Sequence, residues 1–336
     1  MASRTVKAPW KVFGLMSQLS APIVAAPMNG VSGPELASSV AQAGGLGFIG
    51  AGMVKDAKDL HRDFKRAVEL NGGSESRLGI GLVGFTGSWL VDTAISLRPH
   101  ALWISFGDYQ EAAAKIKKSS IPLMIMVQSV EEALKAGDLD ADAIVAQGSE
   151  SGGHGCGPTS TLCFVPEVID ALQQAGKGHI PVLAAGGIAD GRQMAAALAL
   201  GAAGAVVGTR FAVTKESMLS EAKKQRYVAA KAADTQRVRI YDDLGALDWP
   251  VGIDGRIIAN AFTSAHGTAT LTEEEQQKTA KEEIAKATQD GNLDVVPLWC
   301  GAGIGLIHSV ESAEDAFNAI WSGARARLGA LADAYL

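Results

Sequence analysis

The chain has few cysteines, no run of basic residues and no long apolar segment. Its 336 residues include three cysteines, Cys156, Cys163 and Cys300. An odd and widely spaced set of this kind predicts neither a disulfide framework nor a zinc site. It is typical of a protein kept in a reducing compartment. We therefore expect an intracellular protein without a metal centre.

Charge and hydropathy argue against two further classes of partner. The net charge of −6 is spread along the chain without a lysine- or arginine-rich run, so we expect no nucleic-acid partner. No window approaches the apolar length of a membrane span. Residues 1–19 lack the apolar core of a signal peptide, and the final Ala-Tyr-Leu is not the peroxisomal signal Ser-Lys-Leu. These absences favour a cytoplasmic location with no membrane partner.

What the chain does contain is a regular succession of short apolar runs. They occupy residues 23–26, 47–50, 79–83, 102–106, 123–127, 143–146, 182–185 and 205–208. Near-continuous hydrophobicity is typical of parallel strands that are buried on both faces. Helical patterns lie between them, at 34–43, 92–97, 129–136, 165–175 and 190–200.

This alternation predicts an α/β fold, a closed (β/α)8 TIM barrel. A doubly wound open sheet is the alternative, and it would bind its ligand at one switch point. The barrel is favoured because unusual residues recur at the carboxyl ends of the first, sixth, seventh and eighth expected strands.

Residues 213–298 break this rhythm. Two charged helical patterns, 214–234 and 272–290, flank an irregular stretch at 242–260 that contains Trp249-Pro250. We interpret this segment as a helical cap inserted after the eighth strand and covering the barrel mouth, with residues 20–212 and 299–332 forming the barrel. Trp299 and the glycines after it form either part of the cavity rim or an ordinary turn into the last helix.

The sixth strand opens into a glycine-rich loop, and residues 145–157 read Val-Ala-Gln-Gly-Ser-Glu-Ser-Gly-Gly-His-Gly-Cys-Gly. Gly152 and Gly153 carry no side chains, so a flat ring, a phosphate or a substrate could approach the backbone closely. His154, at the carboxyl end of a strand, is a candidate general acid or base. From the loop alone, a hydrogen-bonding turn residue is an equally good interpretation. We interpret Cys156 as structural.

The seventh and eighth strands end in a pair of glycine motifs. The first is Ala184-Ala185-Gly186-Gly187-Ile188, before a helix that Asp190 caps, and the second is Gly208-Thr209-Arg210. In barrels of this type, the loops after these two strands commonly hold a phosphate on backbone N–H groups at a helix N-terminus. The alternative is that the glycines only make tight turns. No P-loop motif is present, and the paired signal suits one terminal phosphate, as in FMN.

The first strand ends in Ala26-Pro27-Met28-Asn29-Gly30. Pro27 and Met28 could lie along an aromatic ring, and Asn29 offers it a donor and an acceptor. A turn that contains proline is an equally good interpretation of this segment taken alone.

Together these motifs resemble the nitronate monooxygenases, once called 2-nitropropane dioxygenases. The resemblance spans about residues 20–307. It is carried by the first-strand motif, Ala-Gly-Gly-Leu-Gly at 43–47, the segments 147–154, 184–188 and 208–211, Trp249-Pro250, Asp254-Gly255-Arg256 and Trp299-x-Gly-x-Gly. FMN-dependent enoyl-acyl-carrier-protein reductases and some NAD(P)H:quinone reductases share much of the pattern.

The resemblance implies an FMN-binding barrel in which His154 is the catalytic residue. Residues 27–29 would lie beside the isoalloxazine, Gln147 would be a polar flavin contact, and Gly152 and Gly153 would border the flavin edge. The candidate cofactor-binding residues are thus Ala26, Pro27, Met28, Asn29, Gln147, Gly152, Gly153, Ala185, Gly186, Gly187, Gly208 and Thr209. Two positions depart from the family pattern. Many members have alanine at the position of Ser151, and bacterial members often have asparagine near the segment Leu82-Val83-Gly84-Phe85.

The implied activity is FMN-dependent oxidation of alkyl nitronates by O2, with a carbonyl compound and nitrite as products. His154 would take the α-proton of a neutral nitroalkane or stabilise the bound anion. An NAD(P)H-dependent flavin reductase acting on an enoyl thioester or quinone is the first alternative, and a non-catalytic binding protein is the second. One fold hosts many chemistries, so the barrel alone does not choose among them. The expected partners are a small-molecule substrate and O2, and homo-oligomerisation is left open.

Overall fold

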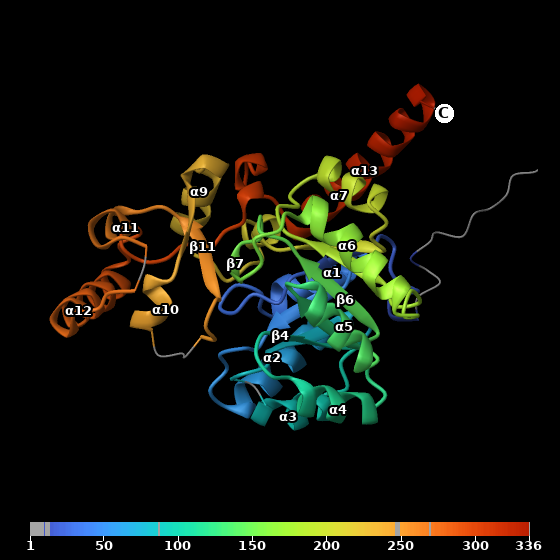
Figure 1. The fold of residues 1–336 in the computed structure, drawn as a ribbon, viewed down its shortest axis with the longest axis horizontal. Helices are drawn as coiled ribbons and strands as arrows, with labels where there is room; N and C mark the ends of the chain where they lie inside the picture. Colours follow the sequence, from blue (N-terminus) through green and yellow to red (C-terminus); the bar gives the residue numbers. More distant parts are fainter. Residues whose placement is uncertain (1–9, 11–13, 87, 246–248, 269, 336) are drawn as a thin grey trace, which may run out of the picture.

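The computed structural model describes residues 10, 14–86, 88–245, 249–268 and 270–335. Its centre is a sheet of eight parallel strands in the order β1-β9-β8-β6-β5-β4-β3-β2 (Figure 1). A parallel bridge between Val24 and Leu46 joins β1 to the β2 side, and Ala25 N–H donates to the Leu46 carbonyl at 2.9 Å. The sheet therefore closes into a barrel, as expected, and is not an open doubly wound sheet.

The eight barrel strands lie within one residue of their expected bounds. They are β1 (Ile23–Ala25), β2 (Gly47–Gly50), β3 (Leu78–Val83), β4 (Ala101–Ser105), β5 (Leu123–Val127), β6 (Ala143–Gln147), β8 (Val182–Ala185) and β9 (Gly204–Val207). A second sheet, in the order β10-β11-β7, contains β7 (Gly153–Gly155), β10 (Thr235–Val238) and β11 (Asp254–Ile258).

Helices surround the barrel and build much of the insert. Those of the barrel layer are α1 (Pro34–Ala43), α2 (Ala57–Leu70), α3 (Val91–Ser96), α4 (Gln110–Lys118), α5 (Val130–Asp138), α6 (Thr161–Gln174), α7 (Gly191–Ala199), α8 (Thr209–Ala212) and α13 (Ala313–Tyr335). Those of the insert are α9 (Glu221–Ala229), α10 (Ile240–Leu244), α11 (Ala261–His266) and α12 (Glu274–Asp290). Short 3-10 helices occupy Gly14–Met16, Ser88–Leu90, Ala232–Asp234 and Ala302–Leu306. None of the helices in the described ranges is long and apolar enough to cross a membrane.

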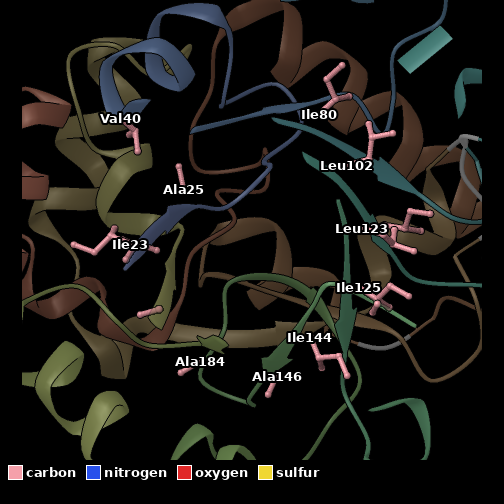
Figure 2. Packing of buried hydrophobic residues seen from close by; sticks show 14 of the residues in the cluster. Ile23, Ala25, Val40, Ile80, Leu102, Leu123, Ile125, Ile144, Ala146 and Ala184 are labelled. Atoms are coloured by element: carbon pink, nitrogen blue, oxygen red, sulfur yellow. The ribbon is translucent and has the colours of Figure 1, made fainter. Parts of the chain in front are cut away.

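Alternate residues of each strand face two separate cores. In β5, Met124 and Met126 pack inside the barrel, while Leu123 and Ile125 pack under the outer helices. Figure 2 shows this outer layer, which consists mainly of aliphatic side chains. The near-continuous hydrophobicity of the strands follows from this burial on both sides.

The inside of the barrel is filled with side chains. Trp103 is fully buried there and packs edge-on against Phe48, with ring centroids 5.5 Å apart. Leu15, Met16 and Leu19 join the same cluster from the N-terminal segment. A packed interior leaves ligand chemistry to the loops at the carboxyl ends of the strands.

The insert differs from expectation because it is not wholly helical, and because α9 covers only part of the helical pattern expected at 214–234. Residues 242–260 were expected to be irregular but contain β11, and β10 precedes them. β11 pairs antiparallel with both β10 and β7. Since β7 belongs to the loop after β6, the insert is joined to the barrel at the carboxyl end of its strands. Figure 1 shows α10, α11 and α12 to one side of the barrel.

Candidate functional site

The glycine motifs after β8 and β9 contain a set of backbone N–H groups that we call the glycine cradle, defined by Gly186, Gly187, Gly208 and Thr209. Gly186 and Gly187 have φ values of +120° and +69°, a region that favours glycine. Within the described part of the chain, the four N–H groups of the cradle donate to no hydrogen-bond acceptor. The cradle is partly exposed, so its free donors fit an anion such as a phosphate.

The helix that follows Gly187 has a well-formed start. Asp190 accepts hydrogen bonds from the N–H groups of Arg192 and Gln193, and Gln193 completes a capping box. This cap fixes the chain immediately after the cradle. The sequence predicted Asp190 as the cap, and the structure confirms it.

Thr209 connects the cradle to the segment that follows the insert. Its hydroxyl accepts a hydrogen bond from Gly301 N–H at 2.8 Å. A Cβ on Gly152 would collide with the backbone of Cys300 and Gly301. The Trp299-x-Gly-x-Gly motif therefore crosses the Gly-Gly-His loop beside the cradle, so it does more than make a turn into the last helix.

The segment at the end of β1 lies near the same cradle. A Cβ built on Gly208 would stand 3.6 Å from Ala26 and 3.7 Å from the sulfur of Met28. Asn29 is exposed, and its Oδ1 accepts from Met53 N–H at 3.1 Å. Pro27 packs so closely over Gly81 that a side chain there would collide with it. The structure thus brings this segment and the cradle together.

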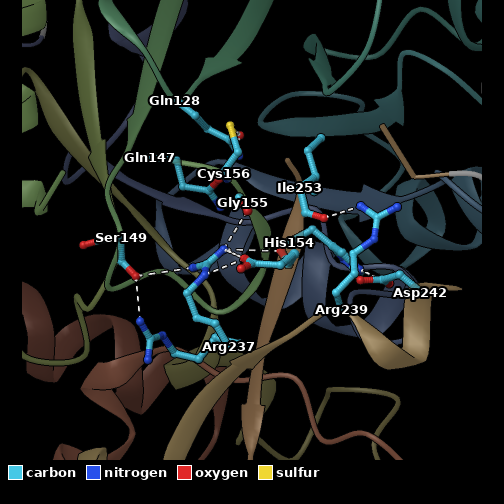
Figure 3. Close-up of polar contacts among 12 residues, drawn as sticks. Gln128, Gln147, Ser149, His154, Gly155, Cys156, Arg237, Arg239, Asp242 and Ile253 are labelled. Atoms are coloured by element: carbon cyan, nitrogen blue, oxygen red, sulfur yellow. Dashed lines mark hydrogen bonds and ion pairs between the residues drawn. The ribbon is translucent and has the colours of Figure 1, made fainter. Parts of the chain in front are cut away.

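Gln147 belongs to a polar pair that also contacts Cys156. Gln128 Nε2 donates to Gln147 Oε1 at 2.5 Å, and Gln128 Oε1 accepts from the Cys156 thiol at 2.8 Å (Figure 3). Desolvation raises the pKa of the Cys156 thiol. A neutral thiol that donates a hydrogen bond fits a structural role.

His154 lies at the centre of β7, where aromatic and acidic side chains of the insert hold its ring. Its Nε2 lies 2.6 Å from Asp242 Oδ1 in α10. The imidazole stacks on Trp249, with ring centroids 3.6 Å apart and an interplanar angle of 10°, and lies against Trp299 at 4.6 Å. Nδ1 has no hydrogen-bond partner among the described residues and is not a buried orphan.

Trp249 also contacts the barrel. Its ring packs edge-on against Phe85 and Phe106, with centroid distances of 5.0 Å and 5.2 Å. Phe85 stands in the segment that departs from the family pattern. That segment here supplies an aromatic contact for the insert.

Three arginines join the insert to the Gly-Gly-His loop and to its own turn. Arg237 Nη2 donates to the Gly155 carbonyl at 2.6 Å, and Arg256 Nη2 donates to the Ser149 carbonyl at 2.9 Å. Arg239 donates to the carbonyls of Trp249, Pro250 and Ile253. Figure 3 shows the contacts of Arg237 with Gly155 and of Arg239 with Ile253 around His154. Burial lowers the pKa of Arg256, and its guanidinium stays charged because its ordinary pKa is so high.

Asp242, Arg237 and Arg239 are the site residues that sequence reasoning missed. Asp242 lies 88 residues from His154 along the chain, and no local motif connects them. Trp249 was noted as part of a family motif, but its contact with the histidine was not foreseen.

An eight-stranded barrel whose mouth combines free backbone donors with a histidine is typical of an enzyme that uses a phosphate-bearing cofactor. The chain belongs to the nitronate monooxygenase family, whose model matches residues 14–71 and 80–322. The proteins of this family are flavoenzymes, and the chain is an oxidoreductase.

Individual relatives agree with this membership. The nitronate monooxygenase npaC of Metarhizium robertsii is 35% identical over 87% of both chains. FabK from Thermotoga maritima is 28% identical, with a TM-score of 0.81, over 97% of this chain and 99% of its own. A nitroalkane oxidase from Streptomyces ansochromogenes is 26% identical, with a TM-score of 0.77, over 94% of this chain and 99% of its own.

Proposed function

We propose that the protein binds FMN at the barrel mouth and oxidises alkyl nitronates with O2, releasing a carbonyl compound and nitrite. The observation that carries this proposal is the crossing of the Gly-Gly-His loop beside the glycine cradle. Through Gly301, the crossing links the loop that carries His154 to Thr209 of the cradle, where we propose that the phosphate of the cofactor binds. Membership of the nitronate monooxygenase family supports this reaction class.

The residues at the mouth fit FMN. The four free N–H groups of the glycine cradle suit its terminal phosphate. Pro27, Met28 and Asn29 would border one side of the ring, and Gln147 would offer its amide. Gly153 has open space around its Cβ position, which leaves room for a flat ring beside the loop, whereas Gly152 lets the backbone of Cys300 and Gly301 pack against that loop. When bound, FMN supplies electron acceptance from the electron-rich nitronate and reaction with O2.

His154 carries the acid–base step in this proposal. With Nε2 engaged by Asp242, the unpartnered Nδ1 can accept the α-proton of a neutral nitroalkane. The resulting imidazolium then stabilises the nitronate anion. A substrate supplied as the nitronate has already lost this proton and needs only the second role.

The insert, residues 213–298, would cover the mouth and shield the flavin from solvent. Two contacts support this role: the pairing of β11 with β7, and the packing of Trp249 against Phe85 and Phe106. Removing water from the site strengthens every electrostatic contact within it.

The purified protein tests the proposal directly. We expect flavin absorption bands, release of FMN on denaturation, and nitrite formation when an alkyl nitronate is added in air. A colourless folded protein that takes up no added FMN would exclude the cofactor. A flavoprotein that forms no nitrite from any alkyl nitronate would exclude the activity.

A flavin reductase is the second candidate, because the similarity to FabK covers nearly the whole of both chains. Anaerobic stopped-flow mixing separates the two. Rapid bleaching of the flavin by NADH or NADPH would favour the reductase, whereas bleaching by a nitronate with slow or absent reaction with either nicotinamide supports the oxidation proposed here.

A further inference from the structure

Asp242 is a buried carboxylate whose only hydrogen-bond partner among the described residues is an imidazole. Its side chain is 5% exposed, and Oδ1 lies 2.6 Å from His154 Nε2. Oδ2 is buried without any partner in the described part of the chain. The nearest positive side chain along the chain, Arg239, is bound to Asp243 and to three carbonyls. Among the described residues, His154 is therefore the side chain that hydrogen-bonds this carboxylate.

We propose that Asp242 is the positioning residue for His154, an inference that rests on the proposed role of that histidine. Because a carboxylate oxygen accepts, Nε2 must carry the hydrogen, and the lone pair of the neutral ring is fixed on Nδ1. Stacking on Trp249 fixes the plane of the same ring. Asp242 thus determines which ring nitrogen accepts the substrate proton and the direction in which the lone pair of that nitrogen points.

Electrostatics give Asp242 a second effect. When the α-proton moves from the substrate carbon to Nδ1, the C–H electron pair stays on the nitronate and the imidazole becomes a cation. A carboxylate at 2.6 Å that pairs with no other cation among the described residues stabilises that charge, because the pair is shielded from solvent. The Trp249 ring face adds a cation–π contact.

The environment of Asp242 argues against a purely structural role. A buried carboxylate oxygen without a hydrogen bond destabilises the folded state. The insert contains another histidine–carboxylate pair, His266–Glu283, with atoms 2.9 Å apart. It is more exposed and has no contact with the catalytic loop among the described residues, so it provides a matched control.

The kinetic test compares Asp242→Asn, His154→Asn and Glu283→Gln. Asparagine keeps the shape of the side chain, but its amide can donate to Nε2 and so place the hydrogen on Nδ1. We expect Asp242→Asn to retain flavin and to lower kcat for a neutral nitroalkane by on the order of 10²–10⁴-fold, the range of general base catalysis. KM and turnover of a preformed nitronate should change much less, and Glu283→Gln should match wild type.

The double variant of Asp242 and His154 should be no slower than His154→Asn, because the two residues act as one unit. Turnover of the neutral nitroalkane by Asp242→Asn within twofold of wild type would overturn the proposal. So would equal losses on both substrates together with loss of flavin, since that pattern indicates structural damage.

A spectroscopic test is independent of turnover. In ¹⁵N-labelled protein, the His154 ring, assigned from its absence in His154→Asn, should show a downfield proton on Nε2 that Asp242→Ala removes. Persistence of that signal in Asp242→Ala, or protonation of Nδ1 alone in wild type, would overturn the proposal. If the signal behaves as expected but no nitronate is oxidised, the positioning stands and the proposed function fails.

Discussion

The glycine cradle and the His154 cluster lie side by side at the barrel mouth, but they are built in opposite ways. The cradle consists of backbone from two short contiguous motifs, after β8 and β9. The His154 cluster consists of the side chains of His154, Asp242, Trp249 and Trp299. The last three lie 88 or more residues away from His154 in sequence. One site is encoded locally, and the other exists only when distant segments pack together.

This difference predicts that cofactor binding and catalytic rate depend on different parts of the barrel mouth. Substitution by any residue except proline keeps the backbone N–H donors, so the cradle is damaged chiefly by adding bulk or charge. The cluster depends on individual side chains, each of which can be deleted without disturbing the cradle. Substitutions in the two regions should therefore give different defects, one in cofactor content and one in rate.

The largest effect is expected in the cradle. Gly187→Glu places a side chain where φ is +69° and the new Cβ would lie 3.0 Å from Glu150 Cβ, and its carboxylate repels a phosphate dianion. We expect the protein to purify without flavin, as measured by absorbance after denaturation. Gly176→Glu is the control, since Gly176 has a φ of +74° with open space around it. Normal flavin content in folded Gly187→Glu would remove the cradle from the cofactor site.

His154→Asn should show the opposite defect, with flavin retained and rate lost. Turnover of a neutral nitroalkane should fall by on the order of 10²–10⁴-fold, while a preformed nitronate should suffer less. Initial rates of nitrite formation on the two substrates measure this difference. Equal losses on both would indicate anion stabilisation or orientation, and unchanged rates on both would exclude the histidine from the mechanism.

A smaller effect is expected from loosening the turn that carries Trp249. Arg239→Lys loses the planar fork that reaches three carbonyls. We expect kcat/KM to fall about tenfold, or about 1.4 kcal/mol, with flavin content unchanged. Arg62→Lys, at an exposed arginine paired with Asp59 and Asp63, should be neutral. A wild-type rate in Arg239→Lys would show that the turn needs no such anchor.

The smallest effect concerns Cys156, which follows β7 and hydrogen-bonds Gln128. Because desolvation raises the pKa of its thiol above the ordinary value of 9.0, the thiol is neutral at pH 7 and alkylation should accelerate only as the pH rises past that value. Peptide mass spectrometry after iodoacetamide treatment measures this profile. Cys156→Ser keeps a donor for Gln128 and should leave turnover within about twofold. Rapid alkylation at pH 7 would contradict the structural assignment.

The barrel could be predicted from the sequence because its strands are buried on both faces, which gives each an unbroken apolar run. The glycine motifs of the cradle could also be recognised in the sequence, since each motif is contiguous. The helices α2 and α4 were not foreseen. Helix α6 begins at Thr161 rather than at the expected residue 165, and Pro166 therefore lies inside the helix.

The second sheet could not be predicted, and the reason is physical. β7 is Gly-His-Gly, which has no intrinsic preference for a strand, and only its pairing with β11 makes it one. Asp242 likewise has no local signal, because its role depends on where α10 packs. Contacts between segments far apart in sequence decide both features.

The pairing of β7 with β11 has a consequence for how this enzyme can be altered. His154 is a residue of the barrel by sequence, but its strand is a member of the insert's sheet, opposite Gly255. Any movement of the insert that preserves the sheet carries the histidine with it. If the insert covers the mouth and His154 is the base, as proposed above, widening the entrance would withdraw that base from the mouth, and substrate access would be coupled to proton transfer. A chimera that exchanges the insert with a relative would need to exchange residues 148–157 as well.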